Sequence, residues 1–250
     1  MLLNDAMIRN LCTKKVYTEP RRLDAGELGS LSVPRQPVLS EAVLLNPEPM
    51  IEPFSEAVSG NGVISYGLSH AGYDLRLGPE IMLFKNSSME TIDPKRFMDE
   101  NYRRRMFDEW TYSTKRIDDT LLDSHQWTLN SLNVTRMDSD NSYVIPPNSY
   151  ILGRSLEYLR IPRHIKGRCV GKSTLARSGI LVNTTPLEPG WCGHLTIEIG
   201  NITPCPAKVY VMEGIAQLEF ELLTAPPEVD YEAKDGQYQG QLGVTPARVK

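Results

Sequence analysis

The sequence predicts a mainly β fold, a barrel or a sandwich made of short strands. The chain of 250 residues contains 18 glycines and 18 prolines, a content that favours frequent turns over long helices. From residue 143 to residue 223, short apolar runs alternate with turn residues, as in "SYVIPPNSYILGRSLEYLRIP", "GILVN", "HLTIEIG" and "IAQLEFELL". Many short strands separated by such turns are typical of all-β architectures.

The composition indicates one globular domain over residues 1–250. Hydrophobic residues make up 40% of the chain, and 250 residues suffice for one substantial core. The formal net charge of −4 argues against nucleic acid as a partner, and no apolar run approaches the roughly 20 residues that span a membrane. Asp5 and Arg9 interrupt the apolar amino terminus, which is unlike a secretion signal, so we expect a cytoplasmic protein.

The amino-terminal part divides into a short helix and an extended region. Residues 1–16 predict a helix that Asn4 or Asp5 can cap, with Met7, Ile8 and Leu11 on one face. Residues 17–62 are rich in proline, glycine and charge, and we expect them to wrap the surface.

The rest of the chain predicts strands, one polar interruption and a tail. Residues 63–98 show the alternation of strands, punctuated by glycines. Residues 99–141 are polar and predict at most a few helical turns. The tail, residues 225–250, has little apolar content and should be flexible unless another part of the protein orders it.

A basic and hydroxyl-rich cluster, "GKSTLARSG", is the first candidate site. Lys172, Ser173, Thr174 and Arg177 offer the charges and donors that bind a polyphosphate, with Lys172 as a mobile point charge. A helical turn over 173–177 would add the partial charge of its amino end. The spacing is not that of a P-loop. The alternative is a surface helix with a solvated lysine and arginine.

Two carboxylates are candidates for acid–base chemistry. In "HLTIEIGN", alternation predicts that Leu195, Ile197 and Ile199 face one side and Thr196 and Glu198 the other. Partial burial would raise the pKa of Glu198, which suits a group that takes and gives a proton. The alternative is a solvated outer face of the strand. Glu188, beside the Pro189–Gly190 turn, would be solvated or would cap a backbone N–H.

The chain resembles the dCTP deaminases, relatives of the trimeric dUTPases. "GKSTLARSGILVNTTPLEPGWCGHLTIEI" is similar to that family's nucleotide-binding core, and "SYGLSHAGYDLRLGPEIMLF", "VIPPNSYILGRSLEYLRIP" and "AKVYVMEGIAQLEFE" are similar to its other blocks. "GQYQGQLGVTPAR" is similar to its nucleotide-closing carboxyl segment. These blocks cover roughly residues 50–98 and 142–248.

The resemblance implies a distorted, dUTPase-like β-barrel with short peripheral helices, assembled as a homotrimer with sites at subunit interfaces. It implies conversion of dCTP to dUTP and ammonia, with Glu198 as general acid/base, Ser173 positioning the water and Arg177 orienting Glu198. Backbone carbonyls of residues 184–186 would help to hold that water. The substrate-binding set that it implies is Lys172, Ser173, Thr174, Leu175, Ala176, Arg177, Thr196, Ile197, Glu198, Gln217, Tyr231 and Gln241.

The sequence argues against zinc chemistry. Cys12, Cys169, Cys192 and Cys205 form no CxxC pair and are expected to be reduced and structural, and no His is followed by x-Glu as zinc deaminases require. We therefore expect no protein metal site, and Mg²⁺ only as the companion of the triphosphate.

Two regions depart from the family pattern, and two other functions stay open. Residues 1–49 form an extended amino-terminal region, and residues 99–141 are an insertion that could be a lid, a partner surface or a solvated loop. One alternative function is a dUTPase or a bifunctional enzyme that yields dUMP, in which Glu188 would stand where phosphate hydrolysis uses a carboxylate, usually Asp. The other is a non-catalytic nucleotide-sensing protein.

Overall fold

The computed structural model describes residues 1–13, 48–85, 91–110, 141–183 and 185–249. Its helices are α1 (Asp5–Thr13), the 3₁₀ helix η2 (Pro94–Arg96), α2 (Glu100–Met106) and α3 (Ser173–Ala176). Its strands are β1 (Ile51–Glu52), β2 (Val58–Gly60), β3 (Val63–Ser69), β4 (Gly72–Phe84), β5 (Phe107–Trp110), β6 (Ser142–Ile145), β7 (Ser149–Arg160), β8 (Ile165–Gly171), β9 (Ile180–Asn183), β10 (Pro186–Leu187), β11 (Cys192–Asn201), β12 (Ala207–Tyr210) and β13 (Gly214–Leu222).

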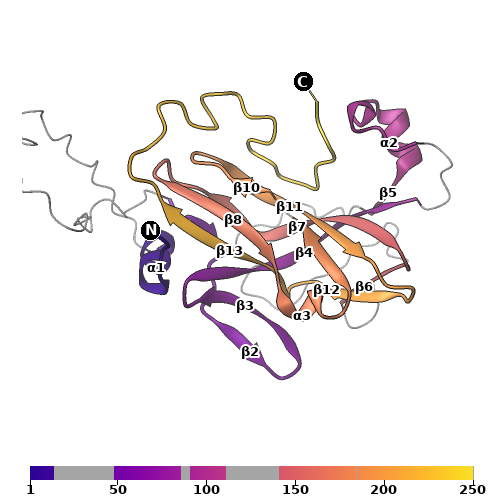
Figure 1. The fold of residues 1–250 in the computed structure, drawn as a ribbon, viewed down its shortest axis with the longest axis horizontal. Coiled ribbons are helices and arrows are strands. Elements are labelled where there is room, and N and C mark those ends of the chain that lie inside the picture. Colours follow the sequence, from indigo (N-terminus) through magenta and orange to yellow (C-terminus); the bar gives the residue numbers. More distant parts are fainter. Residues whose placement is uncertain (14–47, 86–90, 111–140, 184, 250) are drawn as a thin grey trace, which may run out of the picture.

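One sheet with the order β10-β8-β13-β4-β7-β11-β9 forms the body of the molecule (Figure 1). The sheet curls until β9, at one end, approaches β8, next to the other end. At this closure, a Cβ on Gly171 would lie only 3.2 Å from the main-chain oxygen of Val182. The short pair β6–β12 adds a second, two-stranded layer. The prediction of a mainly β, distorted barrel is confirmed for the single chain.

Strand alternation fills the inside of the curl with apolar side chains. Strands β4, β11 and β13 contribute side chains that are fully buried: Leu75, Leu77, Ile197, Ile199, Leu218 and Phe220. Full burial of one such side chain stabilises the fold by about 1.5–3 kcal/mol. Because β11 alternates strictly between buried and half-buried positions, its other face is available for polar side chains.

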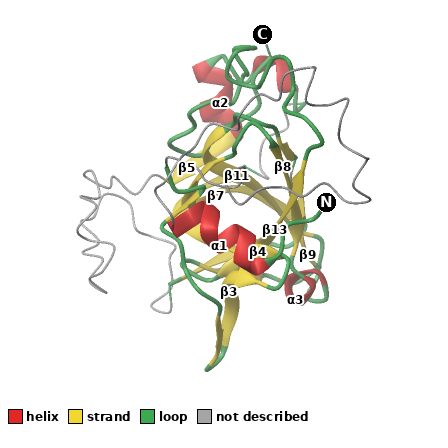
Figure 2. Ribbon diagram, turned by 90° about the vertical axis from the view of Figure 1, so that its left-hand side faces the viewer, coloured by secondary structure: helices red, strands yellow, loops and turns green. Residues whose placement is uncertain are grey.

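Helix α1 covers one side of the sheet, beside β3 and β4 (Figure 2). The side chain of Asn4 accepts a hydrogen bond from Met7 N at 3.0 Å, which satisfies a free donor of the first turn. Ile8 and Leu11 are fully buried, so the predicted helix, cap and apolar face are confirmed. Residues 14–16 of the predicted helix, and residues 17–47 of the region predicted to wrap the surface, lie outside the described residues.

The start of the predicted insertion is part of the fold. Asp99 caps α2, and β5 pairs with β4. Phe97, Tyr102, Met106 and Phe107 pack with Met82 and Leu152 into a second buried cluster. Residues 100–107 are therefore not a solvated loop, which corrects that interpretation for this part, while residues 111–140 lie outside the described residues.

The carboxyl tail lies across one end of the barrel, above β10 and the start of β11 (Figure 1). Gln241 forms a parallel bridge with Gly193, and His194 N donates to Gln241 O at 2.8 Å. The barrel itself orders the tail, so the expected flexibility is not observed. In the described part of the chain, no helix has the length and apolar content to cross a membrane.

Candidate active site

A cavity of about 330 Å³ lies between the tail, β11 and the aromatic cluster of residues 84–107. Its polar lining comes from the 185–188 turn, from β11 and from the tail: Thr185, Glu188, Thr196, Glu198, Tyr231, Tyr238, Gln241 and Thr245. Its apolar lining is Phe84, Phe97, Phe107, Tyr150, Leu152, Pro186, Leu187, Trp191, Leu195 and Ala247. Apolar walls with a few converging polar groups are typical of small-molecule sites.

Strand β11 directs Glu198 into this cavity. Glu198 lies opposite Leu152 of β7 on one side and Asn183 of β9 on the other. A register shift between His194 and Thr196 marks a bulge, where Leu195 N donates to Ser155 Oγ at 2.8 Å instead of continuing the ladder. Bulges re-aim the side chains that follow them.

The carboxyl of Glu198 is poised for proton transfer. Burial raises its pKa from 4.5 to about 7, and a hydrogen bond from its own backbone opposes the shift. Its Oε2 is buried and has no hydrogen-bond partner in the described structure. Burial, with Glu198 as the second cause, also raises the pKa of Tyr150. A carboxyl with a pKa near neutrality can both accept and donate a proton at working pH.

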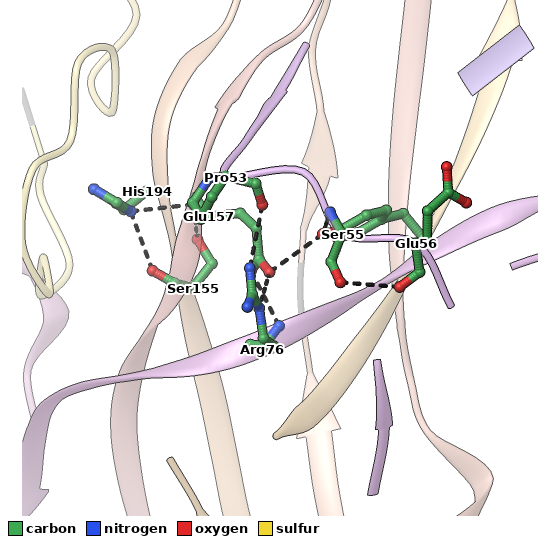
Figure 3. A network of polar contacts seen from close by, with 8 residues as sticks. Pro53, Ser55, Glu56, Arg76, Ser155, Glu157 and His194 are labelled. Atoms are coloured by element: carbon green, nitrogen blue, oxygen red, sulfur yellow. Dashed lines mark hydrogen bonds and ion pairs between the residues drawn. The ribbon is translucent and has the colours of Figure 1, made fainter. Parts of the chain in front are cut away.

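A buried polar network supports β11 from behind (Figure 3). His194 Nδ1 lies 3.1 Å from both Ser155 O and Glu157 O, and it must donate because both partners are carbonyls. Burial, then the nearby Arg154, lower the pKa of His194 to about 4, so the ring is neutral. Glu157 is fully buried, and its Oε1 accepts a hydrogen bond from Arg76 Nε at 2.7 Å, so the two side chains form an ion pair. This network fixes the strand without contacting the cavity.

The tail closes the cavity next to Glu198. Thr196 Oγ1 accepts a hydrogen bond from Thr245 N at 3.1 Å, and it lies 3.5 Å from Gln241 Oε1. Trp191 Nε1 donates to Tyr238 O at 2.8 Å, and Tyr231 N donates to Pro189 O at 3.0 Å. The predicted site residues Thr196, Tyr231 and Gln241 therefore meet at Glu198.

The 172–177 segment lies elsewhere. It forms the predicted helical turn, α3, but Figures 1 and 2 both show α3 and the tail at opposite ends of the barrel. Ser173, Thr174, Ala176 and Arg177 are exposed, and none of the described residues 172–177 lines the cavity. Leu175 is only 4% exposed and anchors the turn in the core.

Lys172 does not have the mobility expected of it. Its ammonium group forms an ion pair with Asp74 and lies 3.2 Å from Ser65 Oγ, with the lysine side chain only 10% exposed. The prediction of a mobile point charge is therefore wrong for the single chain, because Asp74 already neutralises it. Gln217 lies opposite Asp74 on the neighbouring strand, so this predicted residue belongs with the α3 group.

Two further predicted site residues, Ile197 and Glu188, differ in how they are exposed to the cavity. Ile197 is fully buried in the core, so only its main chain can face a ligand. Glu188 lines the cavity with its side chain 42% exposed, and Lys166 Nζ lies 3.7 Å from it. Among the described residues, no three His, Cys, Asp or Glu side chains form a group that could hold a metal ion.

Comparison with known proteins identifies the family. A model described as dCTP deaminase-like matches residues 45–223. The chain belongs to the dCTP deaminase-like family. This membership confirms the resemblance that the motifs indicate, and the matched range ends before the tail.

Two curated relatives of this family are similar over most of their length. A dCTP deaminase of Helicobacter hepaticus is 43% identical over 201 residues, which is 80% of this chain and 90% of that protein. A dCTP deaminase of Acidobacterium capsulatum is 45% identical over 195 residues, 78% of this chain and 88% of that protein. A solved 2′-deoxycytidine 5′-triphosphate deaminase from Agrobacterium tumefaciens is 16% identical, with a TM-score of 0.41 over 69% of this chain and 42% of that one.

Sequence reasoning missed several cavity residues of this dCTP deaminase-like chain. Trp191, Tyr238 and Thr245 lie inside the quoted blocks, but their side chains have no pattern that marks them. Phe84, Phe97 and Phe107 come from β4 and the 94–110 segment, and only the pairing of β5 with β4 brings them to the cavity. Of the carbonyls expected to hold water, residues 185 and 186 line the cavity and residue 184 lies outside the described residues.

Proposed function

We propose that this protein catalyses the hydrolytic deamination of dCTP to dUTP and ammonia. One observation supports this most directly: Glu198 is a half-buried carboxyl with a pKa of about 7 and an unpartnered oxygen, in a cavity sized for a small ligand. The relatives that are 43–45% identical carry the name dCTP deaminase.

The reaction needs a base and then an acid at one position. Glu198 takes a proton from water as the hydroxide oxygen bonds to C4 of the cytosine ring, and it gives that proton to N3. It then takes the proton of the new hydroxyl and gives it to the amino group, which leaves as ammonia while C4 becomes a carbonyl. A single carboxyl with a pKa near neutrality can serve all of these transfers.

We propose that a second copy of the chain completes the site, within a homotrimer. Ser173 and Arg177 are exposed and lie at the other end of the barrel from the tail, so they serve another subunit's Glu198 rather than their own. There Ser173 would position the water and Arg177 would orient the carboxylate. Thr174 and the main chain of α3 would contact the triphosphate.

If Lys172 binds the triphosphate, its ammonium group must interact with a phosphate oxygen and with Asp74 at the same time. The Lys172–Asp74 pair holds the amino end of α3 in place while main-chain N–H groups of α3 bind phosphate. Mg²⁺ would be a companion of the triphosphate, with phosphate oxygens and water as its main ligands, as this cation prefers. The absence of zinc and the cytoplasmic location stay predictions.

Hydrolysis of the triphosphate is the second candidate function, because Glu188 faces the cavity. The Lys166 ammonium lies 3.7 Å from this carboxylate, and the longer glutamate side chain displaces it from the place that an aspartate would take. We therefore favour deamination alone.

The test is incubation of the purified protein with dCTP, dCMP, CTP and dUTP, followed by chromatography and ammonia detection. We expect dUTP and ammonia from dCTP, without pyrophosphate. Pyrophosphate released from dUTP would make the protein a dUTPase or a bifunctional enzyme. Binding of dCTP without any product would favour the nucleotide-sensing alternative.

A further inference from the structure

The tail is held to the barrel in two different ways along its length. Residues 231–241 are bonded to the barrel at many points, through main-chain groups such as Gly240 N to Cys192 O at 2.9 Å and through the side chain of Gln239, whose Nε2 donates to Gly190 O at 3.0 Å. Residues 242–249 make only two described hydrogen bonds to the barrel: Thr245 N to Thr196 Oγ1 and Val244 N to Glu80 Oε1 at 3.0 Å. The end of this segment is tied back to the tail itself, because Arg248 donates to Tyr238 Oη at 3.1 Å and to Gln237 O at 3.0 Å. Its described hydrogen bonds to the barrel next to the ligand cavity thus depend on two side chains, Thr196 and Glu80.

Glu80 owes its orientation to a bulge in β4. The ladder between β4 and β7 runs from Leu77–Ser155 directly to Ile81–Gly153, so three residues of β4 intervene where β7 has one. Such bulges redirect side chains. The bulge is itself anchored, since Tyr143 donates to Pro79 O at 2.8 Å.

The two carboxylate oxygens of Glu80 have separate partners. Arg154 Nε lies 3.0 Å from Oε2, close enough for an ion pair although its N–H does not point at the oxygen. Oε1 accepts from the tail. Arg154 is only 8% exposed, and burial lowers its pKa, so it needs the opposite charge of Glu80 beside it.

Apolar contacts alone would not fix the position of this segment. Val244 and Ala247 pack against the aromatic cluster around Phe97 and Phe107. Apolar contact is not directional, whereas a hydrogen bond to a fixed carboxylate sets the position of the tail along the barrel. Thr196, which accepts the hydrogen bond from Thr245 N, lies directly opposite Arg154 in the pairing of β11 with β7.

We propose that Glu80, fixed by Arg154, is a positioning residue that holds residues 243–247 closed over the cavity. It contacts no reacting atom. Its effect on catalysis rests on the proposed function, but its effect on the tail does not.

Hydrogen exchange of the ligand-free full chain tests the proposal without substrate. In Glu80→Gln, we expect the amides of Val244 and Thr245 to exchange about tenfold or more faster, while β11 keeps its protection, because the neutral amide oxygen is a weaker acceptor than the carboxylate and no longer forms an ion pair with Arg154. Glu56→Gln, the same change in an exposed ion pair with Arg9, should leave the tail unchanged. Unchanged exchange of residues 244–245 in Glu80→Gln would overturn the proposal.

A change on the tail side avoids any loss of stability from an unpaired Arg154. Val244→Pro removes the N–H donor and leaves Glu80 and Arg154 intact. We expect faster exchange of Thr245, and no such change in Leu242→Pro, whose side chain is 75% exposed and whose N–H has no described bond. Equal protection of Thr245 in the two proline variants would contradict the role of Glu80.

Kinetics then separate positioning from general stability. Glu80→Gln should raise the KM for dCTP about tenfold with kcat changed less than about threefold, as should a chain that ends after Leu242. The combination should raise KM no further, because both changes release the same segment. Additive effects would overturn the proposal, whereas faster tail exchange without any dCTP turnover would overturn the proposed function alone.

Discussion

Two parts of the proposed site differ in whether one chain is enough to form them: the Glu198 wall, which is the lining of the cavity around Glu198, and the α3 turn, residues 172–177. Glu198 lies in a cavity that strands, an aromatic cluster and the tail close within one chain. Ser173 and Arg177 lie exposed on a four-residue helix, and their neighbour Lys172 is neutralised by Asp74. The fold thus buries Glu198, the proposed acid/base, within one chain and presents the groups proposed to assist it at the surface, which supports the proposal that another subunit receives them.

The largest effect should come from the tuned carboxyl. Glu198→Gln keeps the shape of the side chain but removes the proton acceptor, so kcat for dCTP should fall about 10³-fold. Calorimetry should show dCTP binding within a few-fold of the unmodified protein. A variant that keeps more than about a tenth of the activity would show that the Glu198 wall is not the reacting side.

The next effect concerns the neutralised lysine of the other region. Asp74→Asn leaves the Lys172 ammonium largely buried without its partner, which should cost about 2–3 kcal/mol, less than for a fully buried pair because both side chains keep slight exposure. Denaturant unfolding at neutral pH measures this loss. An unchanged stability would mean that Lys172 is free, and the contrast between the regions would weaken.

The pH dependence reports the tuning of Glu198 directly. The first step needs the ionised carboxylate, so kcat/KM should rise about tenfold between pH 6 and pH 8, with an apparent pKa near 7. A profile flat over this range would contradict the burial of Glu198.

The same shift has a consequence for stability with a defined sign. The folded protein holds the Glu198 proton more tightly than the unfolded chain, so this contribution is fully present below about pH 4.5 and is lost as the pH rises through 7. Glu198→Gln should flatten that part of the curve of unfolding free energy against pH. A curve identical to that of the unmodified protein would show that the carboxyl is not shifted.

The smallest effect is expected at the rim of the cavity. Glu188→Gln should lower kcat/KM for dCTP by less than about threefold, because its half-exposed carboxylate faces Lys166 rather than a reacting group. The measurement is deamination together with pyrophosphate release. A large loss would place a second essential carboxylate in the Glu198 wall.

The sequence patterns predicted the features that depend on residues close together in the chain, such as strand alternation and helix capping. Alternation in "HLTIEIGN" predicted the orientation of Glu198 but left its burial open, and the cap at Asn4 predicted α1. The contact of Lys172 with Asp74 joins residues 98 positions apart, and no local pattern encodes it. The direction of Glu80 depends on a bulge that only the pairing of β4 with β7 reveals.

The tail shows the same limit. Its polar composition predicted flexibility, because composition does not show that Trp191 and the start of β11 supply bonding partners. Its closing role came from the family resemblance, and the aromatic wall that it packs against could not be predicted from the polar 99–141 segment.

Subunit mixing tests the account most directly. Glu198→Gln and Arg177→Ala chains, each inactive alone, are unfolded together, refolded in equal amounts and assayed with dCTP. If each site combines Glu198 of one subunit with Arg177 of another, randomly mixed trimers regain roughly a quarter of the unmodified activity. If the mixture stays as inactive as its components, both groups act within one chain, and the division between the two regions is wrong.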